Sequence, residues 1–178
     1  MDVFECIEKR RSVRSFKSTP LPEEDVRKIL RAGIMAPSAG NIQPWEFVVT
    51  TKEDLKMRLA AAALGQYWMA EAGVIITVCV VEEESATYYG TRGKNLYCIQ
   101  DTAAAVENML LAATALGYGS CWVGAFDEIE VRKVLKMPKE VRPVAMIPIG
   151  VPAESPEPRR RKDLHKVVHF EVYVGSGL

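Results

Sequence analysis

The chain has 178 residues, of which 48% are hydrophobic, enough for one domain with a buried core. Its 23 basic and 23 acidic residues give a formal net charge of zero, which argues against a nucleic-acid-binding coat or an acidic tail. No apolar run is long enough to span a membrane, and the N-terminus lacks the pattern of a signal peptide. We therefore expect a cytoplasmic protein with neither nucleic-acid nor membrane partners.

Cysteine and histidine residues give no sign of a metal or disulfide framework. The four cysteines are scattered and form no CxxC pair, which is typical of reduced thiols rather than of disulfides or zinc. His165 and His169 lie four residues apart in a segment that reads as a strand, and no third ligand is nearby. We expect no metal site.

A first helix is predicted at the start of the chain, because Asp2 can cap it and Val3, Phe4 and Ile7 give it an apolar side. A second helix is predicted after Pro22, where acidic residues favour its N-terminus, and it should stop before the next proline. A third helix is expected over residues 52–63.

Three arginines and a serine lie within five residues at positions 10–14, between the first two helices. Guanidinium groups remain charged and bind phosphate through two parallel hydrogen bonds. This cluster is a candidate anion site. A solvated, positively charged helix end is the alternative interpretation.

Residues 36–47 read APSAGNIQPWEF and form a predicted loop before a strand over residues 45–51. Gly40 would let a flat ligand approach the backbone, and Ser38, Asn41 and Gln43 offer short polar side chains. An ordinary helix–strand connection, with Trp45 in the core, is the alternative.

Residues 73–81 are apolar and rich in β-branched residues, and we predict a strand there that is covered on both faces. Residues 82–95 are polar, and we expect them to form a mobile segment near the site entrance. The three glutamates at 82–84 are most simply a solvent-exposed end of the preceding strand. The longest helix is predicted over residues 99–116. Its apolar surface suits either a domain core or close packing of two copies across a dimer.

A glycine-rich loop over residues 117–126 precedes a short helix that Asp127 can cap. A buried strand follows over residues 141–150, and then a proline-rich linker leads to four consecutive basic residues at 159–162. A nucleic-acid patch is disfavoured there by the zero net charge and the lack of interleaved aromatics. Residues 167–174 alternate as a further strand.

Three of these segments, in this order, resemble motifs of the nitroreductase family of FMN-dependent NAD(P)H oxidoreductases: RRSVRSF, APSAGNIQPW and GYGSCWVG. The resemblance implies an α+β fold, a three-layer α/β/α sandwich with a mainly antiparallel central sheet. It implies one FMN-binding domain over residues 1–152 and a C-terminal extension, residues 153–178, that packs on the partner subunit. The tail would thus be exchanged in a homodimer.

The same resemblance assigns roles to residues. Arg10 and Ser12 would hold the FMN phosphate and ribityl end, and Arg14 would reach the pyrimidine side of the ring. Gln66 is a candidate for the pyrimidine edge, with a surface amide as the alternative reading. The implied cofactor-binding set comprises Arg10, Arg11, Ser12, Arg14, Pro37, Ser38, Ala39, Gly40, Asn41, Gln43, Gln66, Val123, Gly124, Arg159 and Arg161.

Two parts of this set have particular expected roles. The backbone around Val123 and Gly124 would face flavin N5, and a side chain at Gly124 would block the ring. The basic tail would return to the FMN phosphate. Arg159 and Arg161 fit the family's spacing best, while the sequence leaves open which of the three consecutive arginines makes the contact.

The implied activity is ping-pong transfer of hydride from NADH or NADPH, through flavin N5, to a nitroaromatic, quinone or similar small acceptor. The flavin carries this chemistry, and no catalytic side chain is expected. Two alternatives stay open: a specialised flavin enzyme, such as a reductive dehalogenase or a flavin-cleaving enzyme, and a non-catalytic protein that binds FMN or another phosphorylated ligand. The chain carries no Rossmann fingerprint that would separate NADH from NADPH.

Overall fold

A five-stranded sheet forms the centre of the computed structural model, which describes residues 1–173 and 175. The strands follow the order β1-β5-β3-β2, β4 also pairs with β5, and each of these pairs is antiparallel. Their bounds are β1 (Phe16–Lys17), β2 (Trp45–Thr50), β3 (Val74–Val81), β4 (Gly119–Ser120) and β5 (Val141–Pro152).

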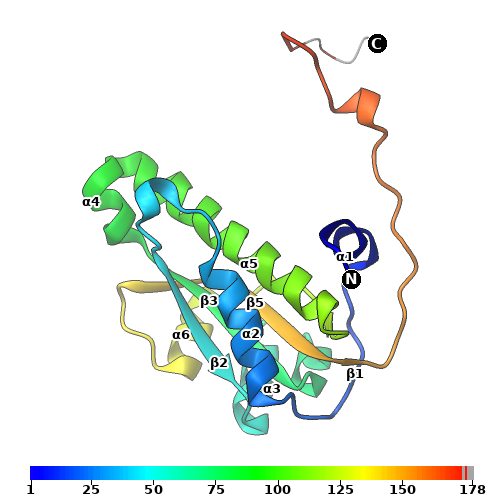
Figure 1. The fold of residues 1–178 in the computed structure, drawn as a ribbon. Coiled ribbons are helices and arrows are strands. Elements are labelled where there is room, and N and C mark those ends of the chain that lie inside the picture. The colour runs from blue at the N-terminus through cyan, green and yellow to red at the C-terminus, as the bar shows by residue number, and fades with distance from the viewer. Residues whose placement is uncertain (174, 176–178) are drawn as a thin grey trace.

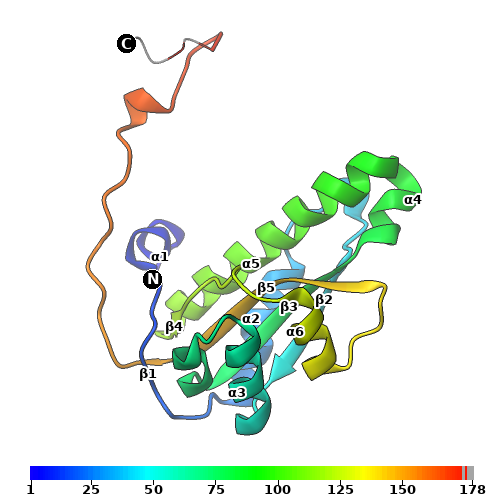
Figure 2. The ribbon, with the colours of Figure 1, turned by 180° about the vertical axis from the view of Figure 1, so that it is seen from behind.

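Helices cover both faces of this sheet (Figures 1 and 2). One face carries α2 (Glu23–Ile34) and α5 (Cys98–Ala115). The other carries α3 (Glu53–Ala62), the 3-10 turn η2 (Tyr67–Glu71) and α6 (Glu128–Leu135). The predicted α+β fold with three layers and an antiparallel sheet is therefore confirmed. No helix in the described part of the chain is both long and apolar enough to cross a membrane.

The alternation of side chains along β3 explains why the sheet is covered twice. Val74, Ile76 and Val78 pack into the core under α2 and α5, whereas Ile75 packs into the core under α3 and α6. All four are fully buried. Successive strand residues point to opposite faces, so a strand that is apolar at every position must be covered on both.

Helix α1 (Val3–Lys9) stands apart from the sheet, beside α5 (Figure 1). Asp2 caps it as predicted, in a reciprocal capping box with Glu5. The predicted apolar side is not buried, however. Val3, Phe4 and Ile7 are all exposed in the single chain, so α1 presents an uncovered apolar surface.

Residues 82–95, expected to be a mobile segment that begins with a solvated strand exit, are helical in the structure. The structure has a helix there, α4 (Glu82–Arg92), followed by a π-helical turn, η3 (Gly93–Tyr97). The glutamates are not a solvated strand exit but the first turn of α4, where negative charge favours helix formation. Ion pairs of Glu82 with Arg142 and of Glu83 with Lys94 hold this turn.

The predicted strand over residues 167–174 is also wrong in its described part. After the 3-10 turn η4 (Leu164–Lys166), the chain passes through bends to residue 173 without strand pairing. Alternating apolar residues form a strand only beside a hydrogen-bonding edge, and this segment extends away from the body of the chain (Figure 1). Val174 lies outside the described residues.

The close approach of Gly119 to Val13 gives a stability prediction. A methyl group on Gly119 would lie 2.9 Å from Val13 Cβ, whereas one on Gly124 would come no nearer than 3.9 Å to any atom beyond its chain neighbours. We expect Gly119→Ala to lower the free energy of unfolding in urea by about 1–3 kcal/mol. The matched Gly124→Ala should change it by less than about 1 kcal/mol. If both variants lose less than about 1 kcal/mol of unfolding free energy, the Val13 side chain moves aside at little cost and the prediction is wrong.

Candidate functional site

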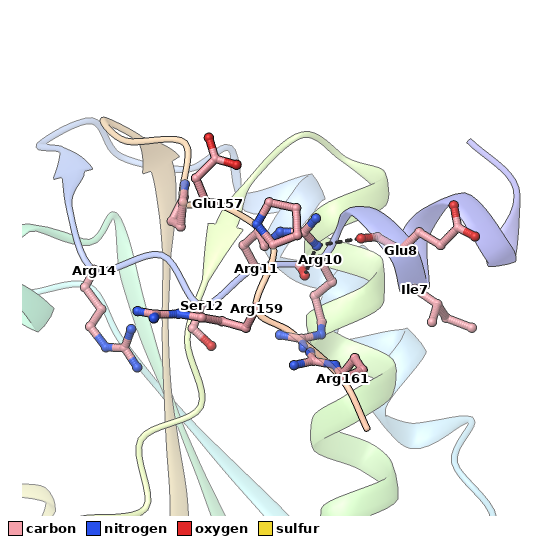
Figure 3. A pocket seen from close by; sticks show the side chains of 11 residues that line it. Ile7, Glu8, Arg10, Arg11, Ser12, Arg14, Glu157, Arg159 and Arg161 are labelled. Carbon is pink, nitrogen blue, oxygen red and sulfur yellow. Dashed lines mark hydrogen bonds between the residues drawn. The ribbon is translucent and has the colours of Figure 1, made fainter. Parts of the chain in front are cut away.

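A cavity of about 520 Å³ lies where the end of α1 faces the C-terminal tail (Figure 3). We call it the arginine pocket. Its lining includes five arginines and only two acids, so it carries an excess of positive charge suited to an anion. The lining residues are Ile7, Glu8, Arg10, Arg11, Ser12, Arg14, Pro156, Glu157, Pro158, Arg159 and Arg161.

The segment after α1 is fixed to the sheet by its backbone. The Val13 N–H donates to the Ser120 carbonyl at 3.0 Å, and Ser12 forms a bridge with Ser120 of β4. The Val13 side chain is buried in the core. Because extended residues alternate in direction, burying Val13 turns Ser12 and Arg14 toward the pocket.

The three N-terminal arginines are held differently. Arg10 is partly buried, with its Nε 3.7 Å from a carboxylate oxygen of Glu107 on α5. Arg11 donates to the carbonyls of Glu8 and Arg10, at 2.5 and 2.9 Å, and so completes the end of α1. Arg14 lies over the Trp68 ring, 6.0 Å from its centroid. Arg10 and Arg14 therefore have the freer guanidinium groups.

The tail contributes alternate residues to the same pocket. Arg159 and Arg161 line it, while Arg160 does not. Figure 3 shows their side chains entering the cavity opposite the N-terminal segment. This alternation follows from the extended conformation of the tail. The structure thus brings together two basic segments that the sequence separates by nearly the whole chain.

Gln66, Val123 and Gly124 do not line the arginine pocket. The Gln66 side-chain nitrogen donates to the carbonyls of Ala63 and Ala125, at 3.0 and 3.1 Å. The backbone of Val123 exchanges two hydrogen bonds of 2.9 Å with Met146. The Gln66 amide and the Val123 backbone therefore already have hydrogen-bond partners within the chain. Gly124 is exposed, and a Cβ there would meet one neighbour, Trp122 Nε1, at 3.9 Å, so a methyl group would fit without a clash.

The loop over residues 36–43 contains the 3-10 turn η1 (Ala39–Asn41) and has an unusual backbone. Gly40, Asn41 and Gln43 all have φ of 57°, in the left-handed region. A methyl group on Gly40 would lie 2.6 Å from the Tyr89 hydroxyl, so a larger residue there would have to displace the Tyr89 side chain. Within the loop, the Ser38 hydroxyl accepts the Gln43 N–H at 3.0 Å.

This loop does not line the arginine pocket. Gly40 and Asn41 instead line a second cavity, of about 590 Å³, together with Tyr88 and Tyr89 of α4. The helix α4 therefore lies beside the predicted ligand loop, where an entrance segment was expected. Neither tyrosine could be singled out from the sequence, because the segment was not expected to be helical.

Helix α5 lies between the two cavities. It contacts the arginine pocket through the ion pair of Glu107 with Arg10, and the loop through a hydrogen bond from the Ala39 N–H to Asp101. Six residues along an α-helix correspond to about 9 Å of rise and about 120° between side-chain directions. The N-terminal arginines and the loop over residues 36–43 therefore meet α5 on different sides.

Asp101 was missed by the sequence analysis. Its side chain is 6% exposed, and one carboxylate oxygen accepts the Ala39 N–H at 3.0 Å. Burial raises the pKa of Asp101, and the bond from Ala39 partly opposes that rise. A lone aspartate in the first turn of an alanine-rich, buried helix is the signal that could have identified it.

Cys121 lies close to the arginines and is buried. Burial raises the pKa of its thiol, with Arg14 as the main opposing influence. Deeper in the sheet, burial raises the pKa of Cys79 to about 12. Both groups are thus neutral thiols at ordinary pH, which suits packing rather than nucleophilic chemistry.

Comparison with known proteins places this arrangement in context. The model of the nitroreductase family matches residues 7–68 and 60–151. A Methanothermobacter thermautotrophicus protein, whose name pairs NADH dehydrogenase with NAD(P)H nitroreductase, is 34% identical over 175 residues, covering 96% of this chain and 87% of its own. A Thermus thermophilus NADH dehydrogenase is 32% identical, with 90% and 91% covered.

Solved structures agree with this result. A nitroreductase family protein from Clostridium novyi superimposes with a TM-score of 0.79 at 33% identity, covering 89% of each chain. The NADPH:FMN oxidoreductase of Vibrio harveyi, complexed with NAD+, gives a TM-score of 0.89 at 26% identity, covering 98% of this chain and 79% of that one. From its motifs, its fold and these matches, the chain belongs to the nitroreductase family.

Proposed function

We propose that the protein is an FMN-dependent NAD(P)H oxidoreductase that functions as a homodimer. The observation that carries this proposal is the meeting of Arg10 and Ser12 with Arg159 and Arg161 in one pocket. Arginines from both ends of a chain gathered around one cavity are suited to a doubly charged phosphate, which guanidinium groups bind bidentately. The FMN phosphate is such a group.

The neighbouring surface suits the remainder of FMN. Gly124 is exposed and leaves room for a flat ring, and its N–H has no recorded protein acceptor among the described residues. We infer that this N–H, rather than that of Val123, faces the flavin, because the Val123 N–H already donates to Met146. Arg14 would lie at the pyrimidine side, oriented by Trp68.

A second copy of the chain would complete the site. In our proposal, the partner supplies its loop over residues 36–43 to the arginine pocket and to Gly124. The placement of the loop and the arginine pocket supports this arrangement, because in one chain they line different cavities. The exposed apolar side chains of α1, together with Phe170 and Tyr173 of the tail, are suitable for such an interface. Residues 1–152 would then form the flavin domain, and residues 153–178 would pack on the partner.

When bound, FMN would supply the redox chemistry, accepting hydride from NADH or NADPH and passing it to a nitroaromatic or quinone acceptor in ping-pong order. The chain's own groups would bind the phosphate and orient the ring, and the Gly124 N–H would provide a fixed dipole. The names of the relatives, an NADH dehydrogenase and an NADPH:FMN oxidoreductase, support this class of reaction.

The visible spectrum of the purified protein tests the proposal directly. We expect a flavin spectrum, as isolated or after adding FMN, that bleaches when NADH or NADPH is added without oxygen and returns with a quinone. A flavin that stays oxidised with both nicotinamides would favour a binding protein or a specialised flavin enzyme. A protein that rejects FMN altogether would refute the assignment.

Replacement of single arginines tests the phosphate site. Arg10→Ala should weaken FMN binding by about 1.5–3 kcal/mol, roughly 10- to 100-fold in Kd, because a charge-assisted contact is lost. Arg160→Ala is the matched control, since Arg160 belongs to the same basic cluster but does not line the pocket. Fluorescence titration with FMN measures both. Equal losses would contradict the placement of the phosphate.

Disruption of the apolar surface of α1 tests the dimer. Phe4 is 74% exposed, and Phe4→Asp should convert a dimer into monomers in sedimentation velocity and reduce FMN affinity at least tenfold, because each monomer holds only half of the site. Ile129→Asp, at an exposed apolar residue of α6, is the control. A monomeric variant with undiminished FMN affinity would exclude a site shared between copies.

A further inference from the structure

We propose that Asp101 is a positioning residue that holds the loop over residues 36–43 in its ligand-binding shape, by accepting the N–H of Ala39. The role of this loop in binding flavin rests on the function proposed above. The hydrogen bond itself does not, because it is present in the chain alone, at 3.0 Å and across 62 residues of sequence.

The loop needs a partner at this position for a local reason. Ala39 is the first residue of the turn η1, and a turn of this kind leaves its first N–H groups without internal acceptors. The preceding residue, Ser38, makes no side-chain capping bond because its hydroxyl accepts the Gln43 N–H, and an N-cap side chain reaches the second or third N–H of a turn rather than the first, which is that of Ala39. Asp101 therefore caps η1 from a neighbouring helix.

The backbone of the loop also requires external support. Asn41 and Gln43 are non-glycine residues with φ of 57°, in the left-handed region that L-residues adopt at an energetic cost. Such a shape persists only where surrounding contacts hold it. Among the described residues, the bond from Ala39 to Asp101 is the one hydrogen bond that joins residues 38–43 to a core helix. The other hydrogen bonds of these residues stay within the loop.

The buried surroundings of Asp101 make its carboxylate unfavourable for stability, so stability alone does not explain its presence. It is 6% exposed, and its second oxygen has no hydrogen-bond partner among the described residues. A buried carboxylate with an unpaired oxygen is costly, and alanine would suit the surrounding helix better. The hydrogen bond from Ala39 therefore explains why a carboxylate is present at position 101, and Ala39 belongs to the loop over residues 36–43.

Amide hydrogen exchange and FMN titration of the full-length protein test the proposal together. Without added flavin, Asp101→Ala should speed exchange at residues 39–43 at least tenfold. Asp101→Asn, which keeps a side-chain acceptor, should restore slow exchange to within about threefold of the original. Thr102→Val is the matched control, because Thr102 is buried on the same helix but bonds only to carbonyls of α5.

A double-mutant cycle separates this role from general destabilisation. Ala39→Pro removes the same hydrogen bond from the other side, at a first-turn position that proline suits and after a residue with ψ of 152°. We expect Asp101→Ala and Ala39→Pro each to raise the Kd for FMN about tenfold, and the double variant to raise it no further. If Asp101→Ala does not fold, Ala39→Pro alone removes the hydrogen bond, and it should by itself speed exchange at residues 40–43 and raise the Kd for FMN about tenfold.

Three outcomes decide the matter. Unchanged exchange at residues 39–43 in Asp101→Ala, or fully additive effects in the cycle, would overturn the positioning role. Faster exchange with unchanged FMN affinity would overturn its connection to the ligand. If even the unaltered protein rejects FMN, the proposed function fails, and the exchange results still decide whether Asp101 holds the loop.

Discussion

The pairing of β5 with three other strands is the constraint on which the arginine pocket depends. Along one strand, β5 pairs first with β3, then with β4 through Ile149 and Gly150, and finally with β1 through Val151 and Pro152. The last of these pairings aligns the segment after α1 with the start of the tail. Two hydrogen bonds extend it: from the Ala153 N–H to the Ser15 carbonyl, and from the Arg14 N–H to the Glu154 carboxylate. Arginines near both ends of the chain therefore meet.

This arrangement gathers like charges, and the chain limits the resulting repulsion in two ways. Glutamates stand close to the cluster: Glu107 pairs with Arg10, and Glu157 lies in the pocket lining. The guanidinium of Arg11 is turned onto backbone carbonyls. The remaining positive charge is a favourable setting for an anion, because a bound phosphate would remove repulsion as well as form new bonds.

The fold was largely predictable because its strongest signals are local. Asp2 and Asp127 cap helices where the sequence predicts them, and the apolar run of β3 becomes a strand covered on both faces. Two predictions failed where the signal was ambiguous. Polar composition and two glycines suggested an irregular segment at α4, although Glu82 and Glu83 are stabilised by distant Arg142 and by Lys94. Alternation suggested a strand in the tail, where residues 167–173 pair with no strand of the described chain.

By itself, the sequence determined several helices and strands and the two basic segments, because capping and periodicity depend on neighbouring residues, and its short motifs carried the family resemblance that implied the fold class. Tertiary structure alone decided which of those residues meet. It placed Arg159 and Arg161, but not Arg160, beside Arg10, and it set the loop over residues 36–43 on a different side of α5. It also brought Asp101 to Ala39. Such contacts join residues far apart in the chain, and they are fixed by strand pairing and helix packing, which no local pattern encodes.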